Sequence, residues 1–283
     1  MRALTKMWSL DPRVLDRSLG TMSGHFLTAD GPIEIPKRVL VVVAHPDDID
    51  FGIAGTVDQL TKAGSHVAYC LVTSGEAGED DMTVDATELA AMREAEQTAA
   101  AAEVGVSDLH WLHHPDGMVE NNLKLRCDIS RIIRIEKPDV VITQAPYRRF
   151  DSTYGSHPDH TETGEAAIRA VYPDARNPRS FTAELLDQGY EPHTVPHMWI
   201  SAVEQDLFID ITDSFDAKLR ALRSHESQVA KRDVEWDLEK LMREWGERHA
   251  RIAADAGIEH FDNNEPGDSA NRLAESYRIL DCA

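Results

Sequence analysis

The amino-acid sequence predicts an α/β protein with a doubly wound, mostly parallel sheet. Several short runs are apolar at every position, which is typical of strands that are buried on both faces of a parallel sheet. These runs alternate with longer segments of helical periodicity. The sequence shows no internal repeat and no low-complexity segment, so one domain is the simplest organisation.

The expected elements follow an N-terminal arm over residues 1–36. The first strand combines consecutive Val and Leu residues, and Gly64 ends the helix that follows it. The third helix has apolar residues at helical spacing and stops before Pro138. The expected strands cover residues 39–44, 66–73, 108–112 and 140–143, and the expected helices cover residues 51–63, 86–103, 123–136 and 159–171.

The pattern changes beyond about residue 190. Two short strands are expected over 199–203 and 207–211, and two helices over 216–230 and 234–254, the second of them highly charged. No convincing linker separates this part from the rest. We therefore expect residues 37–283 to form one domain, with a C-terminal elaboration from about residue 190.

The composition excludes several classes of partner. The chain has 29 Lys and Arg against 50 Asp and Glu, a formal net charge of −21. Such a charge repels phosphate backbones and anionic lipid surfaces, so neither nucleic acid nor a membrane is an expected partner. No apolar run is long enough to span a bilayer, and the first twenty residues lack the apolar core of a signal peptide. The three cysteines form no CxxC pattern, and an odd number fits a reducing cytoplasm better than a disulfide framework.

Two segments at strand ends carry the residues that point to chemistry. In open α/β sheets, ligands bind outside the carboxyl ends of the strands. The first strand is followed at once by Ala-His-Pro-Asp-Asp, which supplies His45, Asp47 and Asp48. Unpaired carboxylates are costly to bury, so a cation is the obvious compensation, although one of the two aspartates capping the next helix is the alternative.

The same residue types recur after the fourth strand, where His157, Pro158 and Asp159 are followed by His160. Two His-Pro-Asp triplets at two strand ends of one sheet are unlikely to occur by chance. If His45, Asp48 and His160 converge, two imidazoles and one carboxylate suit zinc in an open catalytic site. The same set suits non-haem Fe(II), so composition leaves the metal open between Zn²⁺ and Fe²⁺.

These motifs resemble the LmbE/PIG-L family of zinc-dependent de-N-acetylases. The resemblance extends from about residue 38 to the last helices, and the paired His motifs are its strongest part. The supporting segments are 73–78, 93–96, 115–117 and 225–228. Membership would imply a Rossmann-like sheet and hydrolysis of an acetamide on an amino sugar or a related small molecule.

The resemblance also implies a role for each residue of the two motifs. Asp47 would be the general base that deprotonates a zinc-bound water, and His157 would stabilise the oxyanion or protonate the leaving amine. Asp159 would orient and charge His157. The zinc ligands would be His45, Asp48 and His160. His225 and Gln228 are left outside the catalytic set.

Candidate substrate contacts are weaker, and each has a structural alternative. Arg93 matches an arginine of the family, but a pair with Glu96 on an exposed helix face would also explain it. Asp116 follows the third strand and would contact substrate or cap a turn. His193 would complete the pocket from the C-terminal part or serve as a structural histidine. Many members of the family have Glu where this chain has Ile49, which leaves the contacts near this position open.

We therefore expect a cytoplasmic, metal-dependent hydrolase that removes acetyl from an N-acetylated amino sugar or glycoside. The acidic chain disfavours a polyanionic substrate. The alternatives are an amidase of a thiol-sugar conjugate, a zinc-dependent hydratase on the same scaffold, and a metal-binding fold without catalysis. Asp47 and His157 argue against the last, because a pure binding module needs neither. A homo-oligomer is expected by analogy alone.

Overall fold

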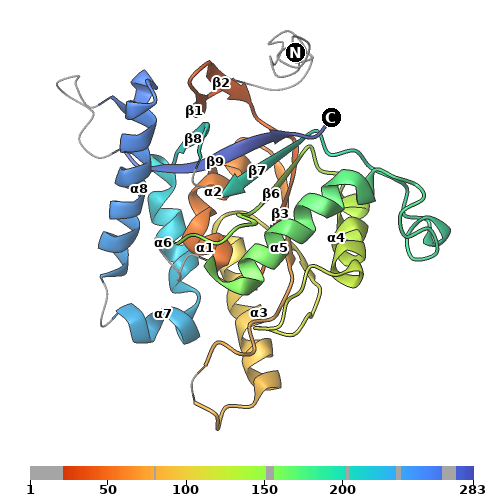
Figure 1. The fold of residues 1–283 in the computed structure, drawn as a ribbon. Coiled ribbons are helices and arrows are strands. Elements are labelled where there is room, and N and C mark those ends of the chain that lie inside the picture. Colours follow the sequence, from red (N-terminus) through yellow and green to blue (C-terminus); the bar gives the residue numbers. More distant parts are fainter. Residues whose placement is uncertain (1–21, 80, 151–155, 202–203, 234–236, 263–271) are drawn as a thin grey trace, which may run out of the picture.

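The structure is a computed structural model that describes residues 22–79, 81–150, 156–201, 204–233, 237–262 and 272–283. Within these residues, one nine-stranded sheet has the order β2-β1-β8-β9-β7-β6-β3-β4-β5. Helices lie along its two faces and at one side (Figure 1). The expected mixed α/β class is therefore confirmed.

The centre of the sheet is parallel. β3 lies between β4 and β6 in register, with Val39 opposite both Val67 and Val140. The chain runs outward from β3 to one edge through β4 and β5, and then returns to β6 and β7 on the other side. This reversal makes the carboxyl ends of β3 and β6 the natural place for a ligand. The parallel strands are β3 (Arg38–Val43), β4 (His66–Leu71), β5 (Asp108–Trp111), β6 (Val140–Gln144) and β7 (His197–Ser201).

The other strands pair antiparallel beyond β7. β9 (Ala274–Asp281) lies between β7 and β8 (Leu207–Asp210), and it was not expected from the sequence. β1 (Met22–Thr28) and β2 (Gly31–Glu34) form a hairpin on β8. Part of the expected N-terminal arm thus belongs to the sheet, and its residues 1–21 lie outside the described residues. The division into an arm and one domain stays a prediction.

Helix bounds differ from expectation mainly at breaks. The helix expected over 51–63 is two helices, because Ile53 between them has φ −142°. The helix expected over 216–230 is likewise two, and residues 202–203 and 234–236 of other expected elements are not described. The helices are α1 (Asp48–Gly52), α2 (Ala54–Lys62), α3 (Ala86–Glu103), α4 (Leu123–Glu136), α5 (Pro158–Arg169), α6 (Phe215–Arg223), α7 (Glu226–Asp233) and α8 (Leu238–Asp255). None in the described part of the chain combines the length and apolarity that crossing a bilayer requires.

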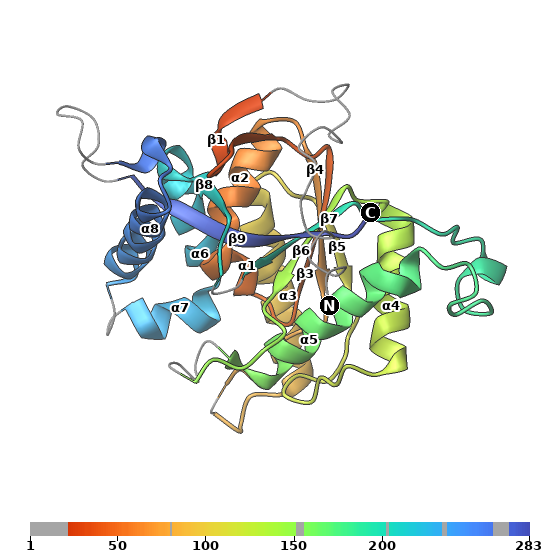
Figure 2. The ribbon, with the colours of Figure 1, turned by 45° about the horizontal axis from the view of Figure 1, so that its top comes forward.

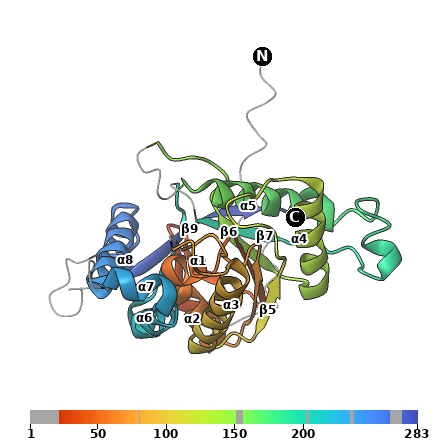
Figure 3. The same cartoon turned by 90° about the horizontal axis from the view of Figure 1, so that it is seen from below.

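Two apolar cores lie on the two faces of the sheet. Successive residues of a strand point to opposite faces, so Val41 packs in one core and Val42 in the other. The first core lies under α2, α3 and α6, and the second under α4 and α5 (Figure 3). The C-terminal helices α6 to α8 gather at the side of the sheet away from α4 (Figure 2). Both faces are thus covered, which leaves the strand ends to form the site.

Candidate active site

The predicted site residues gather at the carboxyl ends of the parallel strands. His45 lies in the short connection between β3 and α1, and Asp48 begins α1. His160 lies in the first turn of α5, which follows β6. The Gln144 side chain at the end of β6 accepts a hydrogen bond from the Ala44 backbone N–H (3.0 Å), which ties the two strand ends together.

Three potential metal ligands converge there. The Nδ1 atom of His45 lies 3.2 Å from Nε2 of His160, although the residues are 115 positions apart. The Asp48 carboxylate reaches both, with Oδ1 at 3.0 Å from His160 Nε2 and Oδ2 at 3.5 Å from His45 Nδ1. These are the two imidazoles and the carboxylate expected from the sequence, and the fold brings their donor atoms together.

The other ring nitrogen of His45 faces two more carboxylates. Its Nε2 lies 3.0 Å from Asp116 Oδ1 and 3.2 Å from Asp159 Oδ2. Both carboxylates are held in place, since Asp116 also accepts the Ala77 N–H (2.9 Å) and Asp159 the Gly117 N–H (2.7 Å). A proton on Nε2 would leave the Nδ1 lone pair facing Asp48 and His160, as in a histidine ligand oriented by a carboxylate. The carboxylate of Asp159 therefore contacts His45, whereas the sequence led us to expect that it orients His157.

This donor set fits a divalent cation. His45, His157 and His160 form one group that could hold a metal ion, and His45, Asp116 and Asp159 form another. Burial would lower the pKa of His45, but hydrogen bonds to Asp116, Asp159 and Asp48 outweigh it and raise the pKa to about 12. The surroundings of His45 thus strongly favour positive charge, as a site for Zn²⁺ or Fe²⁺ must.

Asp47 stands beside these groups in a constrained conformation. Its φ is +83°, in the left-handed region that residues other than glycine seldom adopt. Although Asp47 is the N-cap residue directly before α1, its carboxylate makes no capping hydrogen bond, so the capping alternative does not explain it. Burial raises the pKa of Asp47 to about 6, with Arg93 lowering it and Asp48 raising it. A carboxylate of such pKa suits a general base that works near neutral pH.

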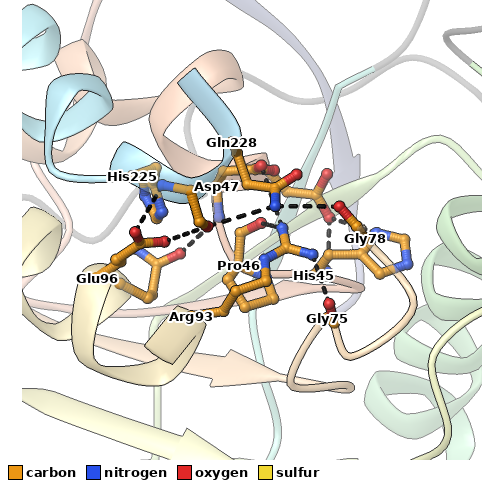
Figure 4. Close-up of polar contacts among 12 residues, drawn as sticks. His45, Pro46, Asp47, Gly75, Gly78, Arg93, Glu96, His225 and Gln228 are labelled. Atoms are coloured by element: carbon orange, nitrogen blue, oxygen red, sulfur yellow. Dashed lines mark hydrogen bonds and ion pairs between the residues drawn. The ribbon is translucent and has the colours of Figure 1, made fainter. Parts of the chain in front are cut away.

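Arg93 holds the loop that carries Asp47. Its guanidinium donates to the backbone carbonyls of Gly75 and Pro46 (2.8 Å each) and to Asp47 Oδ2 at 3.2 Å (Figure 4). With 4% of its surface exposed, Arg93 does not lie on an exposed helix face. A Cβ on Gly78 would lie 2.5 Å from Arg93 Nη1, so glycine here makes room for the guanidinium.

His157 is the exposed residue directly before α5, where it caps the helix. Its ring centre lies 5.0 Å from that of His45 and 5.4 Å from that of His160. Nδ1 accepts the Asp159 backbone N–H at 3.2 Å, so the proton of the neutral ring sits on Nε2. Burial and the positive charge of His45 both lower the pKa of His157.

His193 lies away from this site. Its Nε2 is 2.8 Å from the carbonyl oxygen of Pro138, two residues before β6 begins. That position is the amino end of the strand, opposite to the end that carries the metal-ligating groups. The structure therefore does not bring His193 to the site. Its contact with Pro138 fits the alternative that His193 is a structural histidine.

Sequence reasoning missed a buried network behind Asp47 formed by Asp50, Gln97 and His225. All three side chains are fully buried. Burial would lower the pKa of His225, but the hydrogen bond and the charge of Asp50 outweigh it and raise the pKa. The sequence signal was weak, because Asp50 merely follows the first motif and the motif match at His225 named no partner.

Comparisons with known proteins show which family the chain is similar to. The family model described as PIG-L, GlcNAc-PI de-N-acetylase, matches residues 40–171. Diacetylchitobiose deacetylase of Thermococcus kodakarensis is 35% identical over 208 residues, which cover 73% of this chain and 75% of that protein. The chain belongs to the PIG-L family.

Other PIG-L relatives extend the match. A probable N-acetyl-alpha-D-glucosaminyl L-malate deacetylase 2 of Bacillus subtilis is 30% identical, over 68% of this chain and 84% of its own length. The solved structure of N,N'-diacetylchitobiose deacetylase from Pyrococcus horikoshii aligns with a TM-score of 0.72 at 30% identity. It covers 87% of this chain and 84% of the other, so the likeness to PIG-L proteins spans nearly the whole fold.

Proposed function

We propose that this PIG-L protein is a metal-dependent hydrolase that removes the acetyl group from an N-acetylated amino sugar or glycoside. The observation that carries the proposal is the convergence of His45, Asp48 and His160 beside the carboxylate of Asp47, which is 14% exposed. The relatives support it, since those named above are deacetylases of acetylated amino sugars or their conjugates.

His45, Asp48 and His160 would hold the ion, with Zn²⁺ as the first candidate and Fe²⁺ as the second. A bound zinc ion supplies a Lewis acid that makes water nucleophilic near neutral pH and polarises the amide carbonyl. Asp159 and Asp116 would keep His45 in the ligating tautomer, because both accept from its other ring nitrogen.

The chemical steps fall to Asp47 and His157. Asp47 takes the proton from the attacking water, and Arg93 holds its carboxylate in place from behind. The Nε2–H group of the neutral His157 ring donates a hydrogen bond to the oxygen of the tetrahedral intermediate, and the proton that Asp47 has taken from the water passes to the leaving nitrogen. Free amine and acetate are the products.

The remaining sequence expectations stay proposals. Arg93 and Asp116 make their contacts inside the protein, so we assign them to shaping the site, and direct substrate contacts by them await a test. The strand order β5-β4-β3-β6-β7 supports a Rossmann-like assignment of the parallel half of the sheet. Three cysteines without a disulfide suit the cytoplasm, and a homo-oligomer rests on analogy with relatives.

A substrate panel tests the function. We expect purified protein supplied with zinc to release free amine, detected with fluorescamine, and an equal amount of acetate from at least one acetylated amino sugar or glycoside. Release of amine from a thiol-sugar conjugate alone would favour the amidase alternative. Addition of water to an unsaturated carboxylate, with neither product formed, would favour the hydratase and contradict the proposal.

A further inference from the structure

A chain of buried hydrogen bonds connects Asp47 with the C-terminal part of the molecule. Gln97 on α3 accepts the backbone N–H of Asp47 through Oε1 at 2.9 Å. Its other amide atom, Nε2, donates to Oδ2 of Asp50 at 2.9 Å. His225, between α6 and α7, places Nε2 at 2.7 Å from the same Asp50 oxygen. Figure 4 shows His225 approaching Asp47 from the side of the C-terminal helices.

This arrangement fixes which end of the Gln97 amide faces Asp47. An amide side chain has a donor end and an acceptor end, whereas an ionised carboxylate only accepts hydrogen bonds. The Asp50 carboxylate can accept a hydrogen bond from Gln97 only if the donor atom of the amide, Nε2, faces it. The acceptor atom Oε1 of Gln97 must therefore turn toward the Asp47 N–H. His225 in turn holds Asp50 from the opposite side. The polarity of the network is therefore set by the charge of Asp50.

Stability alone is a poor reason for this network. Asp50, Gln97 and His225 are each 0% exposed, and buried ion pairs are often no more stabilising than apolar residues of similar volume. The backbone of Asp47, in contrast, needs support, since the left-handed conformation is strained for a residue with a Cβ. Gln97 binds the N–H whose orientation depends on that conformation.

We propose that Gln97, Asp50 and His225 are positioning residues of the deacetylation. They hold the backbone of Asp47 so that its carboxylate points at the reacting water, and none of them touches substrate. The proposal rests on the proposed function, in which Asp47 is the general base. It gives the C-terminal part of the chain a share in catalysis through His225.

The first test removes the hydrogen bonds of Gln97 and then exchanges donors and acceptors in the network. Gln97→Leu removes both hydrogen bonds, and we expect kcat to fall by about 10²-fold, the cost of misplacing a catalytic group by an ångström. KM and metal content should stay within about twofold, because the metal-ligating residues are untouched. Gln97→Glu should also lower kcat, since it sets two carboxylates against each other. Adding Asp50→Asn restores a donor facing the new carboxylate, so the double variant should regain most of the lost kcat.

A second arm asks whether the effect passes through Asp47. In an Asp47→Asn background, Gln97→Leu should cause almost no further loss of kcat, because the group that it positions is already inactive. Ser227→Ala is the matched control. Ser227 ties α7 to Glu96 of α3 (2.7 Å) without leading to Asp47, so its loss should leave kcat within about twofold.

The outcomes separate the two proposals. Normal turnover by Asp47→Asn would remove the general base and the positioning proposal with it. An inactive Asp47→Asn beside a folded Gln97→Leu with parental kcat would overturn only the positioning proposal. A fully additive loss of kcat when Gln97→Leu is combined with Asp47→Asn would also overturn it, because it would indicate an effect of general packing. The same holds if Asp50→Asn fails to rescue Gln97→Glu, or if Ser227→Ala loses as much kcat as Gln97→Leu. Melting temperatures of all variants identify any that fail to fold. If Gln97→Leu fails to fold, the comparison of Gln97→Glu with and without Asp50→Asn decides whether the positioning proposal holds.

Discussion

At the scale of single residues, Asp47 is the side chain on which the proposed chemistry depends most. Asp47→Asn keeps the shape of the side chain but cannot accept a proton, so we expect kcat to fall by about 10²- to 10⁴-fold. Metal content should not change, because His45, Asp48 and His160 remain. Amine release and elemental analysis of the same preparation check both statements. Parental turnover with bound metal would show that another group takes the proton.

Gly78 offers a test of how Arg93 supports Asp47. Gly78→Ala places a methyl group against Nη1 of Arg93, so the guanidinium must leave the position in which Nη2 donates to Asp47 and Pro46. We expect kcat to fall by about tenfold, since a displaced supporting group misplaces the base. A Cβ on Gly52 would meet no atom within 4 Å, so Gly52→Ala is the control and should keep its activity. Equal activity of the two variants would show that Arg93 is not needed for placement.

Much of the site was predictable from residue types, but its contacts were not. Two His-Pro-Asp motifs at strand ends were enough to indicate His45, Asp48 and His160 as neighbours, and the fold brings them together. Motifs do not encode the direction of a side chain. For that reason the contact of Asp159 with His45, and the burial of Arg93, became apparent only from the packing of α5 and α3.

At the scale of elements, strands buried on both faces were the easiest to predict. β3 is apolar at nearly every position and has few alternatives. β9 was missed because its sequence mixes Glu, Ser and Arg with apolar residues, and its partners β7 and β8 lie far away along the chain. The break between α1 and α2 was missed because it depends on the backbone of Ile53, although Gly52 directly before Ile53 was a sequence signal for it.

Asp210 at the end of β8 gives an element-level prediction. Burial opposes its ionisation, but hydrogen bonds from Thr212 and His260 outweigh burial and lower the pKa of Asp210. A lowered pKa stabilises the fold above the unfolded-state value, and this contribution is lost as pH falls through the folded-state value. Asp210→Asn should therefore lower the melting temperature most near neutral pH, and the difference from the parent should shrink below about pH 4.

Thermal unfolding across pH measures this difference. Asp213→Asn is the matched control, because Asp213 lies three residues away and is exposed. Its melting temperature should follow that of the parent at every pH. A difference for Asp210→Asn that is constant from neutral to acid pH would mean that the ionisation of Asp210 does not couple to folding.

At the scale of the whole molecule, the site depends on the complete fold. Segments from β3 to the start of α7 meet around Asp47, and the covered faces of the sheet leave the strand ends as their meeting place. The net charge of −21 indicates which partners the surface repels, but the acids that matter most are the few that surround His45. The net charge favours a small-molecule substrate over nucleic acid, and the carboxylates around His45 favour a bound cation.

The most direct test of this account is the dependence of amine release on metal. We expect a chelator to abolish deacetylation of the best substrate in the panel, and about one equivalent of Zn²⁺ or Fe²⁺ per chain to restore it, because His45, Asp48 and His160 form a single proposed set of ligands. Deacetylation that continues at full rate in metal-free protein would contradict the account.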